Sequence, residues 1–289
     1  MSIVQIISPL LLVTSAPVAD GCIQVPGWEE VLAQQEAQWI VIGEFHGSNE
    51  SPALFADLVC QAGQLAPIVV GLEFPQGDQP LIDAFIASDG GETARTAFLQ
   101  ATIWTMPFKD GRSSVAMFAL IERLRALHAA GLVARVVAFQ ADDFTAPPSP
   151  EEYEQAMAAI LIEAGAPGTK VVALVGNIHA MLTQTHYRGG YLPMAGHLPA
   201  ANTLSFNTVD QGGESWVCTG PDECGAQSMG RQRLTPQRGI ALLRDDETLA
   251  AYVSPMPEDA YSGIVFTGSA STASPPQIPA PEEDANATQ

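Results

Sequence analysis

The sequence predicts an α/β fold in which a mostly parallel central sheet is flanked by helices. Short apolar runs recur along the chain, and each has the length of a buried strand. Segments whose apolar side chains have helical spacing lie between these runs. Strands that alternate with helices are typical of parallel sheets, because a parallel connection must cross over the sheet. A helical insertion near residues 79–130 and a small antiparallel β extension near residues 202–220 complete the predicted architecture.

Four apolar runs are predicted to form strands, at residues 39–42, 67–72, 134–139 and 170–176. Polar or titratable side chains follow each run. They are Glu44 and His46, then Glu73, then Gln140, Asp142 and Asp143, and finally Asn177 and His179. Ligands of open α/β sheets bind beyond the carboxyl ends of the strands. The pattern therefore predicts a functional cleft at this edge of the sheet.

The remaining elements follow from apolar spacing and from Gly and Pro. Helices are expected at residues 28–37, 49–62, 79–87, 92–105, 115–130 and 151–164. Residues 202–209 and 214–217 are expected to pair as antiparallel strands around Gly212 and Gly213. A last helix or turn at residues 240–253 and an edge strand at residues 263–267 end the domain.

The chain has 289 residues and a formal net charge of −20, from 32 acidic and 12 basic residues. This length fits a single domain, which is expected to span residues 22–267. The negative charge argues against nucleic acid and anionic membrane surfaces as partners, because both would be repelled. Residues 268–289 are rich in Ser, Ala, Pro, Glu, Asn and Thr, and this composition predicts a disordered tail.

Residues 1–21 resemble a signal peptide, because an apolar segment is followed by small residues such as Ala16 and Ala19. The segment lacks the usual basic start, and it is short of the roughly 20 apolar residues that a membrane span needs. We therefore expect a periplasmic or secreted protein without a membrane span in the mature chain. The alternative is a cytoplasmic protein.

The four cysteines favour an oxidising compartment. Cys218 and Cys224 enclose a tight loop of turn residues, so a disulfide between them is expected to staple a hairpin. Cys60 lies on a predicted helix face with Phe55 and Val59, and it is interpreted as a buried thiol. Cys22 and Cys60 are the leftover pair, and a bond between them is left open.

The expected chemistry centres on His46, because histidine gains and loses its proton near neutral pH. Glu44 and Glu73 would orient His46 as a general base, and His179 would act as an acid or stabilise a developing oxyanion. Water activated by His46 would attack an ester or a related carbonyl. The sequence holds no Gly-x-Ser-x-Gly motif that would supply a serine nucleophile.

Arg112, Asn177 and Asp142 are candidates for binding a small-molecule substrate. Arg112 lies at the start of a predicted helix, where a cation is unfavourable, and this position indicates an anionic ligand or a carboxylate partner. No metal is assigned. The alternative is a metal site formed by Glu44, His46, Glu73 and His179, because two imidazoles and two carboxylates suit Zn, Mn or Fe.

Three segments resemble the superfamily of erythromycin-esterase-like and ChaN-like proteins, which also includes the TraB/Tiki proteins. They are residues 43–50 (Gly-Glu-Phe-His-Gly-Ser-Asn-Glu), residues 71–73 (Gly-Leu-Glu) and residues 176–180 (Gly-Asn-Ile-His-Ala). Residues 194–198 (Met-Ala-Gly-His-Leu) resemble the stretch after the second histidine in the esterase branch. The resemblance covers residues 38–217 and implies an α/β domain.

The branches of this superfamily imply different functions. The esterase branch implies a metal-free hydrolase whose histidine base corresponds to His46. The ChaN-like branch implies an exported protein that binds haem, with His46, His179 or His197 as candidate axial ligands. The Tiki branch implies a metal-dependent peptidase. The helix expected after His46 has no arginine, whereas the esterases carry one there, and Arg112 is a candidate substitute.

Overall fold

The computed structural model describes residues 21–142, 144–220, 223–230, 235–245, 247–252, 256–257 and 259–279. A seven-stranded sheet with the order β3-β2-β4-β1-β5-β9-β8 forms its centre. The strands are β1 (Trp39–Glu44), β2 (Ile68–Pro75), β3 (Val133–Gln140), β4 (Val171–Gly176), β5 (Thr203–Val209), β8 (Gly239–Leu242) and β9 (Gly263–Phe266). All pairings are parallel except that of β8 with β9, so the predicted fold class is confirmed.

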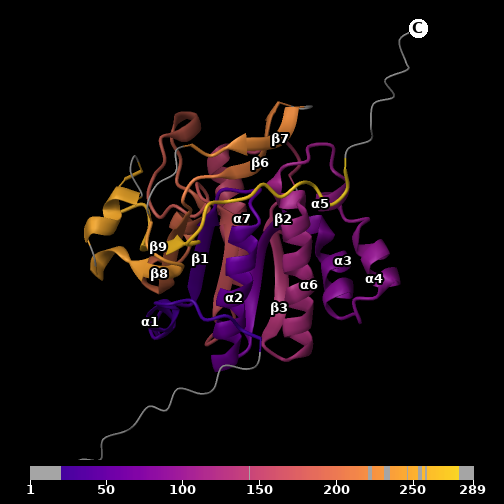
Figure 1. The fold of residues 1–289 in the computed structure, drawn as a ribbon, viewed down its shortest axis with the longest axis horizontal. Coiled ribbons are helices and arrows are strands. Elements are labelled where there is room, and N and C mark those ends of the chain that lie inside the picture. Colours follow the sequence, from indigo (N-terminus) through magenta and orange to yellow (C-terminus); the bar gives the residue numbers. More distant parts are fainter. Residues whose placement is uncertain are drawn as a thin grey trace, which may run out of the picture.

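Helices cover both faces of this sheet (Figure 1). They are α1 (Trp28–Leu32), α2 (Glu50–Leu65), α3 (Gln79–Ile86), α4 (Glu92–Phe98), α5 (Thr102–Thr105), α6 (Val115–Ala129) and α7 (Pro150–Ala164). Alternate side chains of β1 point to opposite faces, as the period of a strand requires. Ile40 and Ile42 join the core beneath α2 and α6, whereas Val41 joins the core that contains Met157 and Leu161 of α7.

The predicted pairing of residues 202–209 with residues 214–217 is wrong. β5 instead joins the central sheet beside β1, and β6 (Glu214–Gly220) pairs antiparallel with β7 (Glu223–Ser228). Burial explains the difference, because most residues of β5 are buried while β6 and β7 are largely exposed or half-buried. A strand covered on both faces belongs inside a sheet. The small antiparallel extension therefore exists, but it begins at Glu214.

The end of the domain also differs from the prediction. β9 lies between β5 and β8, so β8 is the edge strand, and residues 240–242 are extended where a helix or turn was expected.

Short 3-10 turns connect several of these elements. They are η1 (Gln76–Asp78), η2 (Gly111–Ser113), η3 (Tyr187–Gly189), η4 (Met194–His197), η5 (Ala200–Asn202), η6 (Leu243–Asp245) and η7 (Glu247–Tyr252).

Residues 268–279, expected to be disordered, instead cross the domain as an extended strap, drawn in yellow in Figure 1. The Ser274 amide donates to the Gly47 carbonyl at 2.8 Å, and the Gln277 amide donates to the Ser113 carbonyl at 2.8 Å. The composition of small polar residues and Pro indicated disorder, but the backbone groups of this strap are paired with the turns that they cross. Residues 280–289 lie outside the described part of the chain.

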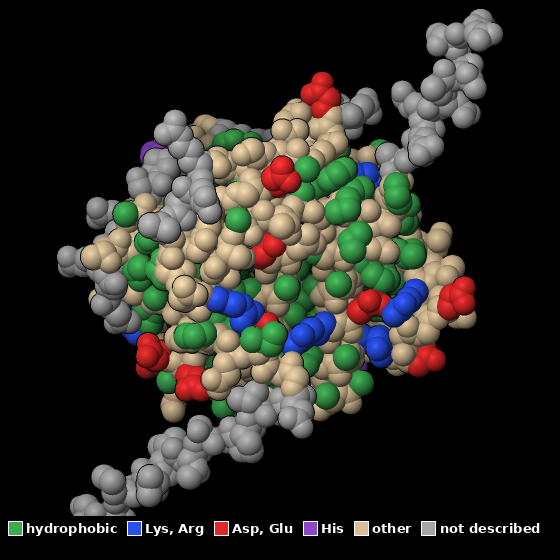
Figure 2. Space-filling view, in the orientation of Figure 1, with side chains coloured by type: hydrophobic (Ala, Val, Ile, Leu, Met, Phe, Trp, Pro, Cys, Tyr) green, Lys and Arg blue, Asp and Glu red, His purple; other side chains and the backbone are tan. Residues whose placement is uncertain are grey.

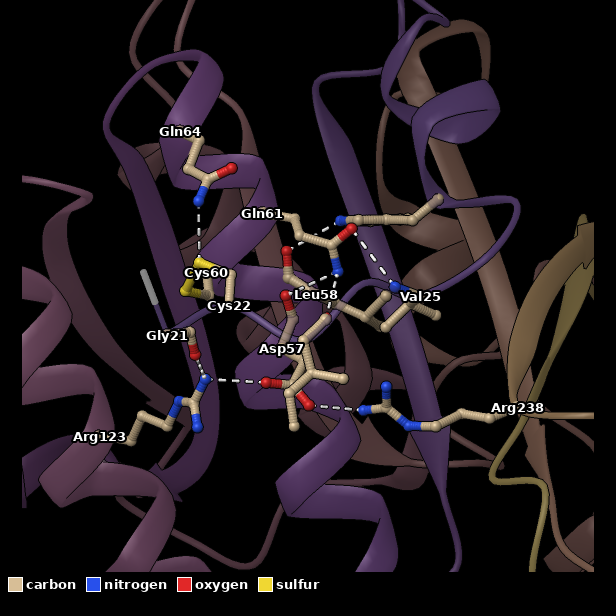
Figure 3. The surroundings of a disulfide bond; sticks show 12 residues. Gly21, Cys22, Val25, Asp57, Leu58, Cys60, Gln61, Gln64, Arg123 and Arg238 are labelled. Carbon is tan, nitrogen blue, oxygen red and sulfur yellow. Dashed lines mark hydrogen bonds and ion pairs between the residues drawn. A yellow bond between two sulfur atoms is a disulfide. The ribbon is translucent and has the colours of Figure 1, made fainter. Parts of the chain in front are cut away.

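The expectation for Cys60 is also wrong, because Cys60 forms a disulfide with Cys22 (Figure 3). The predicted burial of Cys60 holds, but the segment that follows residue 21 passes over α2 and brings Cys22 within bonding distance. The predicted disulfide between Cys218 and Cys224 is confirmed and joins β6 to β7.

Within the described ranges, no helix combines the length and the apolar character that crossing a bilayer requires. The signal peptide predicted at residues 1–21 falls almost wholly outside those ranges. On the face shown in Figure 2, basic side chains form a row across the lower half and acidic side chains lie singly around it. The excess negative charge is therefore not gathered into one patch on this face.

Candidate active site

A cleft of about 640 Å³ opens at the carboxyl ends of β1, β2 and β4. The parallel register aligns these ends, because Glu44 of β1 lies beside Gly176 of β4. The structure brings six of the seven predicted site residues to the lining of this cleft, namely Glu44, His46, Glu73, Arg112, Asn177 and His179. Asp142 is the exception.

His46 lies in the turn after β1 and contacts a carboxylate on each side of its ring. Its Nδ1 atom is 3.0 Å from Oε1 of Glu44, and its Nε2 atom is 3.3 Å from Oε2 of Glu73. Gly47 closes the turn with a φ of 98°, a left-handed value that favours glycine. A Cβ atom at position 47 would lie 2.1 Å from the Trp216 carbonyl, so β6 packs directly on this turn.

The two carboxylates keep His46 protonated. Burial by itself would lower the pKa of His46, but the charges and hydrogen bonds of Glu73 and Glu44 outweigh it and raise the pKa to about 10. Burial raises the pKa of Glu44, against the opposing effect of the His46 hydrogen bond. Oε2 of Glu44 is buried and has no hydrogen-bond partner among the described residues. At neutral pH His46 is therefore an imidazolium.

Glu73 is held at three points. Its Oε1 accepts from Arg112 at 2.9 Å, and its Oε2 accepts from the Gly176 amide at 2.7 Å in addition to facing His46. Burial would raise the pKa of Glu73, but the His46 and Arg112 charges prevail and hold that pKa well below its usual range. Glu73 is thus a fixed carboxylate rather than a proton carrier.

Arg112 has the carboxylate partners that its unfavourable position indicated. Besides Glu73, its guanidinium donates to Asp110 through Nη2 at 2.7 Å and to Gln140 through Nη1 at 3.1 Å. Asp110 also accepts from the Arg112 amide and so caps η2. The contacts that were predicted to bind substrate are therefore made within the protein.

His179 belongs to a second pair of histidine and carboxylate that the sequence did not reveal. Its Nδ1 atom is 2.8 Å from both carboxylate oxygens of Glu154 on α7, and Oε2 of Glu154 also accepts from the Met194 amide at 2.8 Å. The pKa of His179 is raised, because Glu154 and Glu73 outweigh the opposing effect of burial. Among the described residues, no group is hydrogen-bonded to Nε2 of His179.

Glu154 could have been found from helical spacing. Within α7 it shares the buried stripe with Met157, Ala158 and Leu161, at positions i, i+3, i+4 and i+7. A carboxylate in an apolar stripe needs a partner, because burying a lone charge is costly. The neighbouring acidic residues Glu151 and Glu152 concealed this signal, since the run has the composition of a solvated helix start.

Both histidines lie close to Gly176. A Cβ atom at this position would lie 3.0 Å from Nε2 of His46 and 3.4 Å from Cδ2 of His179. Glycine therefore leaves room for both imidazoles at the end of β4. The arrangement brings two histidines, each bonded to a buried carboxylate, to the carboxyl end of β4 in the cleft.

The remaining predicted residues lie at or beyond the edges of the site. Asn177 lines the cleft, and its backbone N–H donates to the Glu44 carbonyl at 2.8 Å. Asp142 lies apart from the lining, because its Oδ2 accepts from the Gly77 amide at 2.9 Å and so stabilises the turn after β2. Asp143 lies outside the described residues. His197 contacts the Leu192 carbonyl at 3.0 Å and is not part of the lining.

The arrangement does not fit the alternative of a metal site formed by Glu44, His46, Glu73 and His179. In the described part of the chain, no three His, Cys, Asp or Glu side chains are grouped as a metal ion would require. Glu73 is engaged by the Arg112 guanidinium, whose positive charge opposes a cation at the same carboxylate. Both ring nitrogens of His46 face carboxylates, so neither is directed to a metal or to a haem iron.

The structure is that of an α/β protein with two histidines, each bonded to a buried carboxylate, at the carboxyl ends of parallel strands. No protein-family model matches the chain, and no curated protein sequence matches it. Solved structures do match. An erythromycin esterase in its open conformation aligns with a TM-score of 0.59 at 10% identity, over 85% of this chain and 94% of the esterase.

Two further solved structures share the fold. A succinoglycan biosynthesis protein aligns with a TM-score of 0.63 at 11% identity, over 86% of this chain and 91% of that protein. A protein from Bacillus cereus aligns with a TM-score of 0.54 at 10% identity, over 86% of this chain and 92% of that protein. The resemblance to erythromycin-esterase-like proteins, expected from three short segments, is thus confirmed at the level of the fold.

Proposed function

We propose that this protein is a hydrolase that cleaves an ester or a related carbonyl compound with an activated water molecule. The observation that carries the proposal is that His46 and His179 both lie close to Gly176 and that each is held by a buried carboxylate. Hydrolysis needs one group that takes a proton from water and one that stabilises the negative charge on the carbonyl oxygen. The two histidines meet these needs in different ways.

His46 is the group suited to stabilise the oxyanion. Its Nε2–H faces Glu73 at 3.3 Å, which is longer than the roughly 2.7–2.9 Å of a strong charge-assisted bond. Oε2 of Glu73 already accepts from the Gly176 amide at 2.7 Å, so the Nε2–H of His46 makes only a weak hydrogen bond when no substrate is bound. A developing oxyanion would be a better acceptor for it.

His179 is the group suited to act as the base. Glu154 holds its Nδ1–H, as the carboxylate of a catalytic triad holds a histidine, and this fixes the tautomer whose Nε2 accepts a proton. The proposal thus exchanges the two roles expected from the sequence. His46 cannot accept a proton while it is an imidazolium between Glu44 and Glu73.

The proposed reaction balances as simple hydrolysis. His179 takes one proton from water as the oxygen of that water bonds to the carbonyl carbon, and the imidazolium of His46 donates a hydrogen bond to the resulting oxyanion. The bond to the leaving alcohol then breaks, and the proton held by His179 passes to the alkoxide. The products are a carboxylic acid and an alcohol, and both histidines return to their starting states.

The test is the pH dependence of kcat/KM for an ester that the purified protein hydrolyses, after subtraction of spontaneous hydrolysis. Because His46 must stay protonated, we expect the rate to fall as the pH rises through about 10, and the neutral form of His179 defines the rising limb at lower pH. His46→Asn and His179→Asn should each lower kcat by roughly 10²–10³-fold. His128→Asn, on α6 outside the cleft, is the matched control.

Two outcomes would contradict this proposal. Full activity in His46→Asn or His179→Asn would remove the corresponding residue from the mechanism. A rate that rises through pH 10 without falling would assign the base role to His46, as expected from the sequence.

The location of the protein follows the same line of argument. We propose that it works in the periplasm or outside the cell, because two disulfides join all four cysteines and such bonds persist in oxidising compartments. Haem binding stays a prediction from the resemblance. A haem titration that gives a Soret band, weakened by His179→Asn, would favour it over hydrolysis.

A further inference from the structure

The mouth of the cleft carries an unusual share of the exposed apolar side chains of the molecule. Seven large apolar side chains of the described residues are exposed, and three of them line this one cleft. They are Phe45 at 46%, Phe108 at 42% and Tyr187 at 49% exposure, and we call them the aromatic rim. Grouped apolar exposure of this kind marks a binding surface, whereas single exposed residues need no explanation.

The rim is assembled from three separate parts of the chain. Phe45 lies between Glu44 and His46 at the end of β1, Phe108 lies in the loop between α5 and η2, and Tyr187 begins η3. Trp216 and Val217 of β6 continue the apolar lining on the side of the small sheet. The fold therefore gathers apolar surface around the two histidines from several elements rather than from one loop.

The charges in the cleft select against anions. Glu44, Glu73, Asp110 and Glu154 line it, and each described cation in the lining is paired with one of them. Arg112 supplies the only guanidinium among the described lining side chains, and it is engaged by Glu73, Asp110 and Gln140. A carboxylate on a substrate would thus meet four carboxylates, and each described cation of the lining already has one of them as its partner, in a chain of net charge −20.

We propose that the substrate is an uncharged ester with an extended apolar portion, which the aromatic rim binds while the carbonyl reaches His46 and His179. This inference rests on the proposed hydrolysis for the word ester, and on the rim and the carboxylates for the rest. The rim sets which substrates enter, and the carboxylates reject those that carry an acid group.

The experiment has a catalytic arm and a binding arm. The catalytic arm compares 4-nitrophenyl hexanoate with the mono-4-nitrophenyl ester of adipic acid, which has the same chain length and ends in a carboxylate. We expect kcat/KM to be at least about tenfold higher for the hexanoate, because the carboxylates that line the cleft repel the added carboxylate of the other ester. Phe108→Ala and Tyr187→Ala should each lower the hexanoate value by several-fold to about tenfold.

The binding arm uses the fluorescence of N-phenyl-1-naphthylamine, an uncharged apolar probe, and does not depend on catalysis. Phe108→Ala should weaken its binding by several-fold or more, and hexanoate esters should displace it from the wild type. Ile162→Ala removes an apolar side chain that is 40% exposed on α7 outside the cleft, so it serves as the matched control and should change nothing.

The outcomes separate this inference from the proposed function. Equal kcat/KM for the two esters, or probe binding that Phe108→Ala and Ile162→Ala leave equally unchanged, would overturn the inference even if esters are hydrolysed. Probe binding that depends on the aromatic rim, without any ester hydrolysis, would contradict the proposed function. It would support only the binding of an uncharged apolar ligand at the rim.

Discussion

Two buried acids, Glu73 and Asp57, each form ion pairs with two cationic side chains, yet they have different roles in the molecule. Glu73 lies between His46 and Arg112 in the cleft. Asp57 of α2 receives Arg123 at 2.8 Å and Arg238 at 2.6 Å (Figure 3). The partners make the difference. Both partners of Asp57 are permanently charged, whereas one partner of Glu73 is a histidine whose proton can move.

The surroundings of Asp57 are those of a clamp. Arg123 also donates to the Gly21 carbonyl and Arg238 to the Gln24 carbonyl, so the carboxylate ties the first described segment to α2, to α6 and to the approach to β8. The disulfide between Cys22 and Cys60 fixes the same segment. None of these residues lines the cleft. A buried ion pair thus belongs to a candidate active site when it includes an exchangeable proton beside a cleft. Without such a proton it is a structural ion pair, which we call a clamp because it holds segments of the chain together.

The largest expected effect on the clamp comes from its disulfide. Replacing Cys22 and Cys60 together by Ser should lower the free energy of unfolding by about 4 kcal/mol, because the bond closes a loop of 38 residues. Replacing Cys218 and Cys224, which are six residues apart, should lower it by about 2 kcal/mol. Denaturant unfolding measures both values.

The two double substitutions, of Cys22 with Cys60 and of Cys218 with Cys224, should also differ in their effect on activity. The first double variant should keep the kcat/KM of its folded fraction, whereas the second should change it, since Cys218 lines the cleft. Equal stability losses, or a loss of activity confined to the first variant, would break the distinction between clamp and site.

A somewhat smaller effect is expected for Asp57→Asn. Removing the charge leaves two arginines facing a neutral amide, and breaking a fully buried pair costs roughly 3–5 kcal/mol. The side chains of Arg123 and Arg238 are 37% and 29% exposed, so solvent screens them and we expect a loss of about 2 kcal/mol. Denaturant unfolding at neutral pH measures this loss.

The control for Asp57→Asn is Arg95→Gln, which breaks the ion pair with Glu122 at a side chain that is 53% exposed. It should cost less than about 1 kcal/mol, because exposed ion pairs contribute little. If the two variants lose the same stability, burial is not what gives the Asp57 bridge its strength.

The sequence predicted the site better than the clamp, for a physical reason. Glu44, Glu73 and His179 each follow an apolar run within three residues, so strand ends that align in a parallel sheet place them together without knowledge of packing. Asp57 and its arginines come from α2, α6 and the approach to β8, and nothing in local spacing shows that these segments meet. The pairing of Cys22 with Cys60 stayed open for the same reason.

The errors follow the same division between local and distant contacts. Gly212 and Gly213 lie between β5 and β6, but local pattern could not show that β5 finds its partner in β1, far back along the chain. The strap at residues 268–279 has the composition of a linker, and its order comes from backbone bonds to Gly47 and Ser113. In both cases the partner, rather than the segment itself, determines the structure.

The smallest expected effect is that of Glu73→Gln. This change keeps the shape of the side chain and removes the charge that does most to raise the pKa of His46. We expect the alkaline limb of kcat/KM to move from about 10 to lower pH by one unit or more, since one unit corresponds to only about 1.4 kcal/mol of interaction. Asp57→Asn should leave the limb in place, because Asp57 does not contact His46.

The free energy of unfolding should also depend on the protonation of His46, and the direction of its change with pH can be measured. The pKa of His46 is raised on folding from 6.5 to about 10, so the stabilisation by its charge is complete below about pH 6.5 and is lost as the pH rises through about 10. In Glu73→Gln this loss should occur over a narrower range that ends at lower pH, as measured by denaturant unfolding between pH 6 and 10.5. An unchanged alkaline limb together with an unchanged stability profile would show that Glu73 does not hold the His46 proton. The buried bridge in the cleft would then be a clamp like that of Asp57.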